Sequence, residues 1–133
     1  MQVFDLEQRP VSLPDADKSF PRVLSLTGDE SQVLLQLEIS PDLDWFRGHF
    51  PDQPVLPGVV QLHWAVLVAQ ACYNLADTPK EIKRLKFKNI VTPPQTLQLT
   101  VSLRGSYEIQ FDFSNSGATF SEGRLIFTAS PEC

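Results

Sequence analysis

The chain contains two histidines, His49 and His63, and a Pro57-Gly58 pair lies between them. An imidazole gains and loses a proton near neutral pH, so either histidine suits general acid or base catalysis. Pro57 is well placed to open a helix, and the backbone N–H groups at a helix start point toward an oxyanion that forms there. These residues predict a site that moves protons beside a polarised carbonyl group. A solvated loop histidine and a Pro-Gly pair that only marks a helix entry are the alternatives.

His63 lies five residues after Gly58, about one and a half turns into the same predicted helix. A protonated imidazole there could donate a proton to a leaving hydroxyl group, and a neutral one could orient a water molecule. Burial and a second histidine nearby would both oppose the charged form, so a hydrogen-bonded core histidine without a catalytic role is the alternative. A metal site is not expected, because His49 and His63 have no third ligand at a familiar spacing.

The segment from Val59 to Leu75 is apolar on nearly every side of the helix that it predicts. Pro51, Pro54 and Pro57 keep the preceding segment extended, because proline fixes φ and disfavours helix at the residue before it. The predicted helix begins after Pro57 and ends near residues 75–77. It is too short, and too often interrupted by polar side chains, for a membrane span of roughly twenty apolar residues. We therefore expect a buried central helix.

Alternating apolar and polar residues predict strands on both sides of this helix. A period of two with one apolar face is typical of an antiparallel sheet that covers a core on one side. Residues 41–46 are expected to form a turn or a single helical turn. The predicted strands cover residues 22–28, 31–39, 82–90, 97–103, 107–113 and 119–129.

Two strands, one long helix and four strands describe an α+β domain, in which an antiparallel sheet of about six strands wraps around one central helix. We expect one such domain over residues 1–133, with residues 1–20 as an irregular arm that holds at most one short strand. One sheet cannot cover a helix that is apolar all round. We therefore expect a second copy of the chain to pack against the helix and form a dimer.

The composition is that of an ordinary globular domain, 42% hydrophobic and 20% charged. A net charge of −5 argues against nucleic acid or an anionic membrane as the main partner. Cys72 lies in the apolar helix and Cys133 is the last residue, so no structural disulfide is expected. The N-terminus lacks the basic and apolar regions of a secretory signal. We expect a cytoplasmic protein.

The residues around the histidines resemble a known family. Phe-x-Gly-His-Phe-Pro occurs at residues 46–51 and Pro-Val-x-Pro-Gly-Val at residues 54–59. Both resemble the signature of the hotdog-fold 3-hydroxyacyl-acyl-carrier-protein dehydratases of fatty-acid synthesis, and a weaker resemblance extends from about residue 20 to about residue 130. Residues 56–63 are most similar to a dehydratase branch found in bacterial aryl-polyene pathways. The resemblance implies the hotdog fold and a dimer, often assembled into trimers of dimers, with active sites at the dimer interface.

The resemblance also implies a reaction. A (3R)-hydroxyacyl thioester on acyl carrier protein would lose water to give the trans-2-enoyl thioester, with no cofactor, because the thioester itself acidifies the α-carbon. His49 would remove the α-proton, and the Gly58 N–H would bind the thioester carbonyl. His63 stands where the family carries Glu or Asp, so it either takes over the handling of the departing hydroxyl group or leaves the site without its acid. The expected substrate-binding residues are Phe50, Pro57, Val59, Leu62 and Phe87, for which plain core packing is the alternative.

Basic side chains concentrate between residues 80 and 88 of this acidic chain. They could dock an acidic acyl carrier protein and the phosphate of its phosphopantetheine arm. The solvated face of a strand is the alternative, which the alternation of residues 84–88 also fits. The expected docking residues are Lys83, Arg84, Lys86 and Lys88.

Two other functions compete with dehydration. A hotdog thioesterase commonly holds its attacking water with a carboxylate near the helix, but no Asp or Glu occurs between Pro57 and Ala76. A non-catalytic acyl-binding or partner subunit would account for the missing carboxylate at His63. The retained His49 and Pro57-Gly58 argue against that reading, so dehydration is the favoured prediction.

Overall fold

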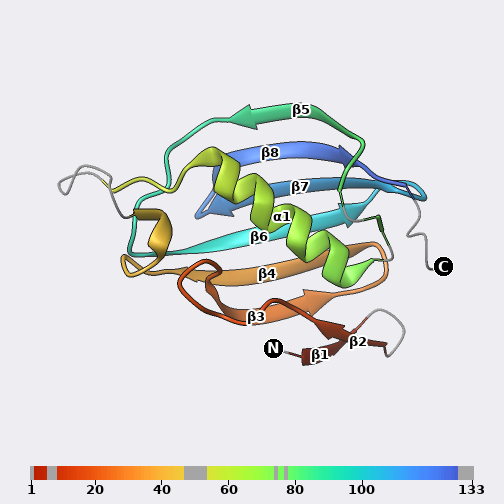
Figure 1. Cartoon of the computed structure of the whole chain (residues 1–133), viewed down its shortest axis with the longest axis horizontal. Helices are drawn as coiled ribbons and strands as arrows, with labels where there is room; N and C mark the ends of the chain where they lie inside the picture. The colour runs from red at the N-terminus through yellow and green to blue at the C-terminus, as the bar shows by residue number, and fades with distance from the viewer. Residues whose placement is uncertain (1, 6–8, 47–53, 74, 77, 129–133) are drawn as a thin grey trace.

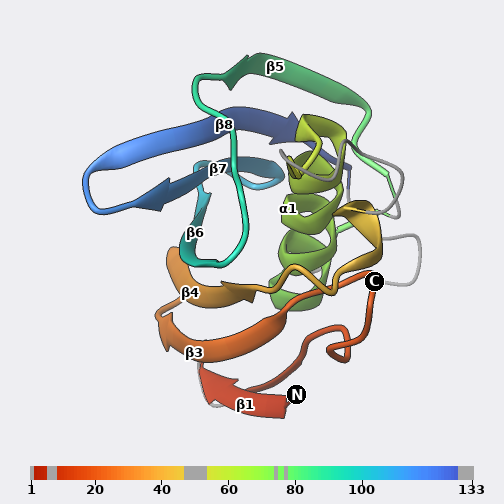
Figure 2. The same cartoon turned by 90° about the vertical axis from the view of Figure 1, so that its left-hand side faces the viewer.

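The computed structural model describes residues 2–5, 9–46, 54–73, 75–76 and 78–128. A six-stranded antiparallel sheet curves around one long helix, α1 (Gly58–Cys72), as Figures 1 and 2 show from two sides. This confirms the predicted architecture. The strands lie in the order β3-β4-β6-β7-β8-β5. Their bounds are β3 Arg22–Gly28, β4 Gln32–Ile39, β5 Glu81–Phe87, β6 Gln95–Leu103, β7 Glu108–Asn115 and β8 Ala118–Ile126.

Alternate side chains of the sheet meet the helix and form the core. The register pairs Leu35 of β4 with Leu99 of β6, and Leu99 with Phe113 of β7. All three side chains are fully buried, as are the apolar residues two positions away on the same strands. Fully burying a side chain of this size stabilises the fold by roughly 1.5–3 kcal/mol. The period of two therefore positions one apolar face of the sheet beneath α1.

Helix α1 begins where Pro57 predicted, but it ends earlier than the predicted residues 75–77. Tyr73 is already extended, with φ −132° and ψ 157°, although its N–H still donates to the carbonyl of Ala69 at 2.9 Å. The chain then turns to the sheet, where Leu75 is buried and the Ala76 N–H donates to the Thr128 carbonyl at 3.0 Å. Tertiary contacts with the end of β8 thus override the continued apolar pattern. In the described ranges, α1 included, no helix has the length and hydrophobicity to cross a membrane.

The N-terminal arm is more regular than predicted. Its strands β1 (Gln2–Asp5) and β2 (Arg9–Ser12) form an antiparallel pair. Four-residue strands are too short to give a sustained period, and Pro10 is tolerated because a two-stranded pair has free edges. Farther along, Leu13 and Phe20 are buried in the core, so the arm is part of the domain. The predicted helical turn in residues 41–46 is confirmed as η1, Asp44–Phe46.

Strand β5, at one edge of the sheet, departs from the predicted alternation. Lys83 pairs with Arg124 of β8, whereas Lys86 pairs with Glu122, so two residues of β5 oppose Gly123. This is a β-bulge, and Arg84 within it has a left-handed φ of 54°. The strand also ends at Phe87, three residues before the predicted end. Residue-by-residue alternation cannot reveal such an insertion, because the bulge depends on the partner strand.

Candidate active site

The start of α1 carries hydrogen-bond donors that have no acceptor among the described residues. Pro57 is the N-cap, makes no side-chain capping bond, and is followed by a first turn without an acidic residue. Its carbonyl accepts from the N–H groups of Val60 at 3.1 Å and Gln61 at 3.3 Å. No described residue accepts from the N–H of Gly58 or Val59. A helix start of this kind has partial positive charge and open donors, which suit a developing oxyanion.

The structure brings two of the predicted site residues together at this turn. Phe87, at the end of β5, places its ring against Gly58, so that a Cβ at position 58 would lie 2.5 Å from the ring's Cε1 atom. Phe87 is nevertheless 51% exposed. Only glycine at position 58 allows this close approach. The ring of Phe87 thus borders the predicted oxyanion donor and remains open to solvent.

The face of α1 that points away from the sheet carries the other helical site residues. Val59 is 71% exposed, and His63, one turn later, is exposed as well. Residues four apart lie on the same face of a helix. Leu62 is partly buried and packs against the core. In the described structure His63 is therefore not the buried core histidine that the alternative interpretation required.

The opposite face of α1 holds a buried polar pair that sequence reasoning missed. The Gln61 side chain accepts a hydrogen bond from Ser121 Oγ of β8 at 2.7 Å, and its Nε2 donates to the carbonyl of Leu56 at 3.3 Å. Gln61 is 2% exposed and Ser121 is fully buried. The only signal in the sequence was an amide within an otherwise apolar helix, because its partner lies sixty residues away.

The predicted docking residues lie on the face of the sheet that points away from the helix. The register pairs Lys83 with Arg124 and Lys86 with Glu122 on β8, and the bulge places Arg84 beside a hollow of about 170 Å³. Lys88 forms an ion pair with Glu122 at 3.3 Å. Burial raises the pKa of nearby Asp112, and the Glu122 carboxylate across the strand raises it further. The hollow is lined by Arg84, Lys86, Gln110, Glu122, Gly123 and Arg124.

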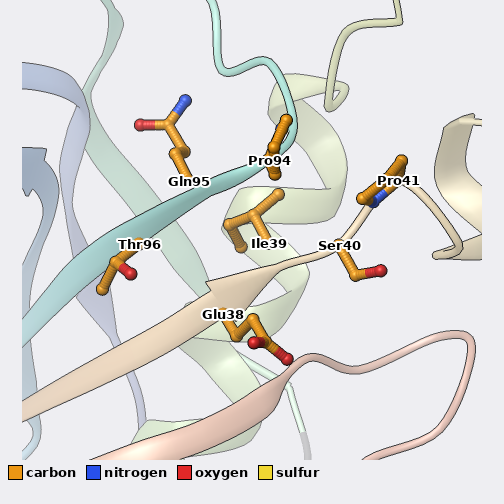
Figure 3. A pocket seen from close by; sticks show the side chains of 7 residues that line it. All are labelled: Glu38, Ile39, Ser40, Pro41, Pro94, Gln95 and Thr96. Atoms are coloured by element: carbon orange, nitrogen blue, oxygen red, sulfur yellow. The ribbon is translucent and has the colours of Figure 1, made fainter.

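A larger hollow, of about 360 Å³, lies between the end of β4 and the start of β6 (Figure 3). Among the described residues that line it, Glu38 is the one titratable residue, and the side chain of Ile39 points toward the ribbon of α1. None of the predicted site residues in the described part of the chain lines it. The described lining holds a single carboxylate and no basic partner, which makes it a poor place for acid–base chemistry. Its lining residues are Glu38, Ile39, Ser40, Pro41, Pro94, Gln95 and Thr96.

Two predicted site residues, His49 and Phe50, lie outside the described residues, so their predicted roles stay predictions. Within the part of the chain that the structure describes, no cluster of three His, Cys, Asp or Glu side chains could hold a metal ion.

Comparison with known proteins agrees with the fold and with the motif. Residues 25–124 match the model of the ApeI-like family, described as ApeI dehydratase. The 3-hydroxyacyl-[acyl-carrier-protein] dehydratase FabZ of Legionella pneumophila subsp. pneumophila is 40% identical over 75 residues, which cover 47% of this chain and 48% of the relative. FabZ of Oenococcus oeni is 33% identical over 89 residues, 62% of this chain and 63% of the relative. The chain thus spans about half the length of the Legionella relative and somewhat more of the Oenococcus one.

Solved structures match over a larger share of the chain. The dehydratase heterocomplex ApeI:P from Xenorhabdus doucetiae contains a chain that is 30% identical, with a TM-score of 0.72 over 80% of this chain and 96% of that one. An uncharacterized protein from Erwinia carotovora subsp. atroseptica is also 30% identical, with a TM-score of 0.67 over 83% and 97% of the two chains. The family model covers well over half of the 133 residues. The chain therefore belongs to the ApeI-like dehydratase family and has the hotdog fold.

Proposed function

We propose that this protein dehydrates a (3R)-hydroxyacyl thioester, carried on acyl carrier protein, to the trans-2-enoyl thioester in fatty-acid or polyene-type biosynthesis. The observation that carries the proposal is the start of α1. Pro57 opens the helix without a capping side chain, and the N–H groups of Gly58 and Val59 have no acceptor among the described residues. In a family of dehydratases, such a turn suits the carbonyl oxygen of a thioester whose α-carbon is losing a proton.

The proposed reaction is an elimination across the α- and β-carbons. His49 takes the α-proton, and the electron pair moves toward the carbonyl, whose oxygen is stabilised by the Gly58 N–H. The enolate then re-forms the carbonyl and the α–β double bond while the β-hydroxyl group leaves as water. The proton for that hydroxyl comes from His63 or from a water molecule that His63 orients.

The position of His63 supports its part in this scheme. Five residues of helix separate it from Gly58 by about 7.5 Å along the axis, a distance that a short acyl segment spans. Its imidazole is exposed on the outer face of α1, beside the open helix start. Replacement of the family's carboxylate by His63 also motivates the competing proposal, a partner subunit without its own activity.

The carrier protein is proposed to dock on the basic side of β5. Lys83, Arg84 and Lys86 are exposed there, and the bulge turns Arg84 toward the same hollow that Lys86 lines. Acidic carrier proteins would be attracted by this concentration of positive charge, and the attraction would weaken with salt. Lys88 is expected to contribute less, since Glu122 already neutralises part of its charge.

A second subunit is proposed to cover the apolar corner formed by the helix start and β5. Val59 and Ile90 are 71% and 67% exposed, and Ile82 and Phe87 are also largely exposed. Strand β5 is an edge strand of the described sheet, so its outer backbone groups can pair with another chain. We propose a homodimer or an oligomer of dimers. The ApeI:P heterocomplex makes a related chain the alternative partner. The buried thiol of Cys72 suits a reducing compartment, and we propose that the protein works in the cytoplasm.

The test is mass spectrometry of a carrier-bound 3-hydroxyacyl thioester after incubation with the wild type, His49→Ala and His63→Ala. Loss of one water with the wild type, abolished in His49→Ala, is the expected result. A smaller rate loss in His63→Ala would assign that residue to water positioning, and a loss as large as that of His49→Ala would make it the acid.

Other outcomes of this experiment would assign a different function to the protein. Release of the free acid would identify a thioesterase. An unchanged substrate mass over several chain lengths, for the chain alone, would favour the partner-subunit function. Adding the related partner chain would then restore turnover.

A further inference from the structure

We propose that Gln61 is a positioning residue. Its side chain holds the Gly58 amide in place for catalysis without itself bonding to the N–H of that amide. The inference rests on the dehydratase function proposed above. It concerns the buried side of the same helical turn, where the Gln61 side chain bridges three segments: the residues before the helix, the first turn of α1, and strand β8.

The direction of the two Gln61 bonds is the first argument. A side chain at a helix start ordinarily caps it by accepting hydrogen bonds from the free N–H groups. Gln61 does the reverse, because its Nε2 donates to the carbonyl of Leu56 and its Oε1 accepts from Ser121. The turn is therefore fastened through a carbonyl and a hydroxyl group. Because no described residue accepts from them, the N–H groups of Gly58 and Val59 stay available to a ligand.

The rigidity of the anchors is the second argument. Leu56 is buried and is held at both backbone groups, since its N–H donates to the Val91 carbonyl at 2.9 Å while its own carbonyl accepts from Gln61. Ser121 is fully buried on β8, which pairs with strands on both sides. Two fixed points, one just before the helix and one on β8, thus hold the first turn of α1 and the Gly58 amide within it.

The register links this anchor to the rest of the site. Ser121 pairs directly with Phe87 of β5, and the Phe87 ring contacts Gly58. Movement of the helix start relative to β8 would therefore shift the amide and the adjoining ring together. Displacement of a reacting group by about 1 Å can cost on the order of a hundredfold in rate. Gln61 is a positioning residue in this sense and touches no substrate.

The test compares Gln61→Met with Gln70→Met, a matched control. Gln70 is on the same helix, and its Nε2 also donates to a main-chain carbonyl, that of Ala76 at 3.2 Å, but at the other end of α1. Gln61→Met keeps the side-chain length and removes both bonds. Its kcat should fall about tenfold or more, with KM for the carrier-bound substrate changed by less than about twofold. Gln70→Met should keep the wild-type kcat, even where its melting temperature falls.

A spectroscopic readout separates positioning from simple destabilisation. A carrier-bound acyl thioester that lacks the 3-hydroxyl group and is ¹³C-labelled at the carbonyl would report the Gly58 hydrogen bond through its carbonyl stretch. The stretch should be lowered on binding to the wild type and to Gln70→Met. It should return toward the solution value in Gln61→Met and in the milder Ser121→Ala. Folded Gln61→Met and Ser121→Ala enzymes with the wild-type kcat and stretch would overturn the inference.

Failure of the proposed function gives a different result. If the wild type dehydrates nothing, the amide NMR signal of Gly58 in the ligand-free protein decides the inference alone. The signal should be single and sharp in the wild type and in Gln70→Met, and broadened or multiple in Gln61→Met. An unchanged signal in Gln61→Met would then overturn it.

Discussion

The two faces of α1 are both largely apolar, but the structure uses them differently. The inward face holds Trp64, Ala65 and Val68, which are all fully buried. It also holds the buried amide of Gln61, whose oxygen and nitrogen atoms both form hydrogen bonds. The outward face, represented by Val59 and His63, is exposed in the single chain. Hydrophobicity alone therefore does not distinguish a stabilising face from a functional one. The hydrogen bonding of the polar side chains does distinguish the two faces, because the buried Gln61 amide has partners whereas the outward His63 is open to solvent.

Apart from Gln61, which is proposed to support the helix start, the inward face stabilises the fold, and the outward face and the helix start carry the proposed chemistry. Substitutions on the inward side should lower the free energy of unfolding. Substitutions at the outward side should change turnover while leaving that free energy almost unchanged. Each of the following predictions would strengthen or break this division.

The largest effect is expected for Trp64→Ala on the inward face. Trp64 is fully buried, its Nε1 donates to the Ser19 carbonyl at 3.0 Å, and its ring meets Phe20 edge-on with centroids 6.0 Å apart. Removing the ring should lower the free energy of unfolding by about 3–5 kcal/mol. Urea denaturation measures it. A loss below about 1 kcal/mol would show that the inward face does not carry the stability.

Gly58→Ala should reduce the rate by about a hundredfold with little loss of stability. The added methyl group would meet the Phe87 ring, which is half exposed and can move aside, so the fold tolerates it. The same methyl group would crowd the approach of the thioester to the amide, where small displacements are costly. The measurement is kcat/KM beside the melting temperature. Gly58→Ala combined with Phe87→Ala is the control: if it regained full activity, only the ring, and not the backbone approach, would matter.

Asp112→Asn, on the outer surface of the sheet, should give the smallest change. Burial and then Glu122 raise the pKa of Asp112 in the folded protein, so its charged form opposes folding. The penalty is fully present above the raised pKa and disappears as pH falls below the unfolded value of 3.8. Asp112→Asn should therefore stabilise the protein near pH 7, by less than about 1 kcal/mol because the site is half-exposed.

The pH dependence supplies the check on Asp112→Asn. Urea denaturation at pH 7 and again near pH 3.5 should show the stabilisation at the higher pH only. A destabilised variant at pH 7 would mean that the carboxylate has a favourable partner there. The turnover of Asp112→Asn should be the same as that of the wild type.

Much of the fold was predictable because it follows from local patterns. Apolar alternation located the six strands of the main sheet, and Pro57 located the start of α1 to the residue. The end of the helix was not predictable in this way, because the Ala76 N–H donates to Thr128, which lies just after β8 and far along the chain. The bulge at Arg84 was not predictable for the same reason. It exists only in relation to β8.

The motif predicts the chemistry of the site, which stays a prediction, but not the contacts that support the site. The motif identified Gly58 and His63, and the structure places the first at an open helix start and the second on an exposed face. The anchor formed by Gln61 and Ser121 could not be read from the sequence, since a single amide in an apolar helix has many possible partners. The arrangement of His49 remains a prediction, outside the described residues.

The most direct test of the division between the two faces compares His63→Ala with Val68→Ala in one experiment. Both remove a side chain from α1, one outward and one fully buried. The rate of water loss from a carrier-bound 3-hydroxyacyl thioester and the free energy of unfolding are measured for each, well below the melting temperature. We predict that His63→Ala loses at least about tenfold in rate and under about 0.5 kcal/mol in stability. Val68→Ala should keep its rate and lose about 1–3 kcal/mol. The reverse pattern, or equal losses of rate in both variants, would contradict the account.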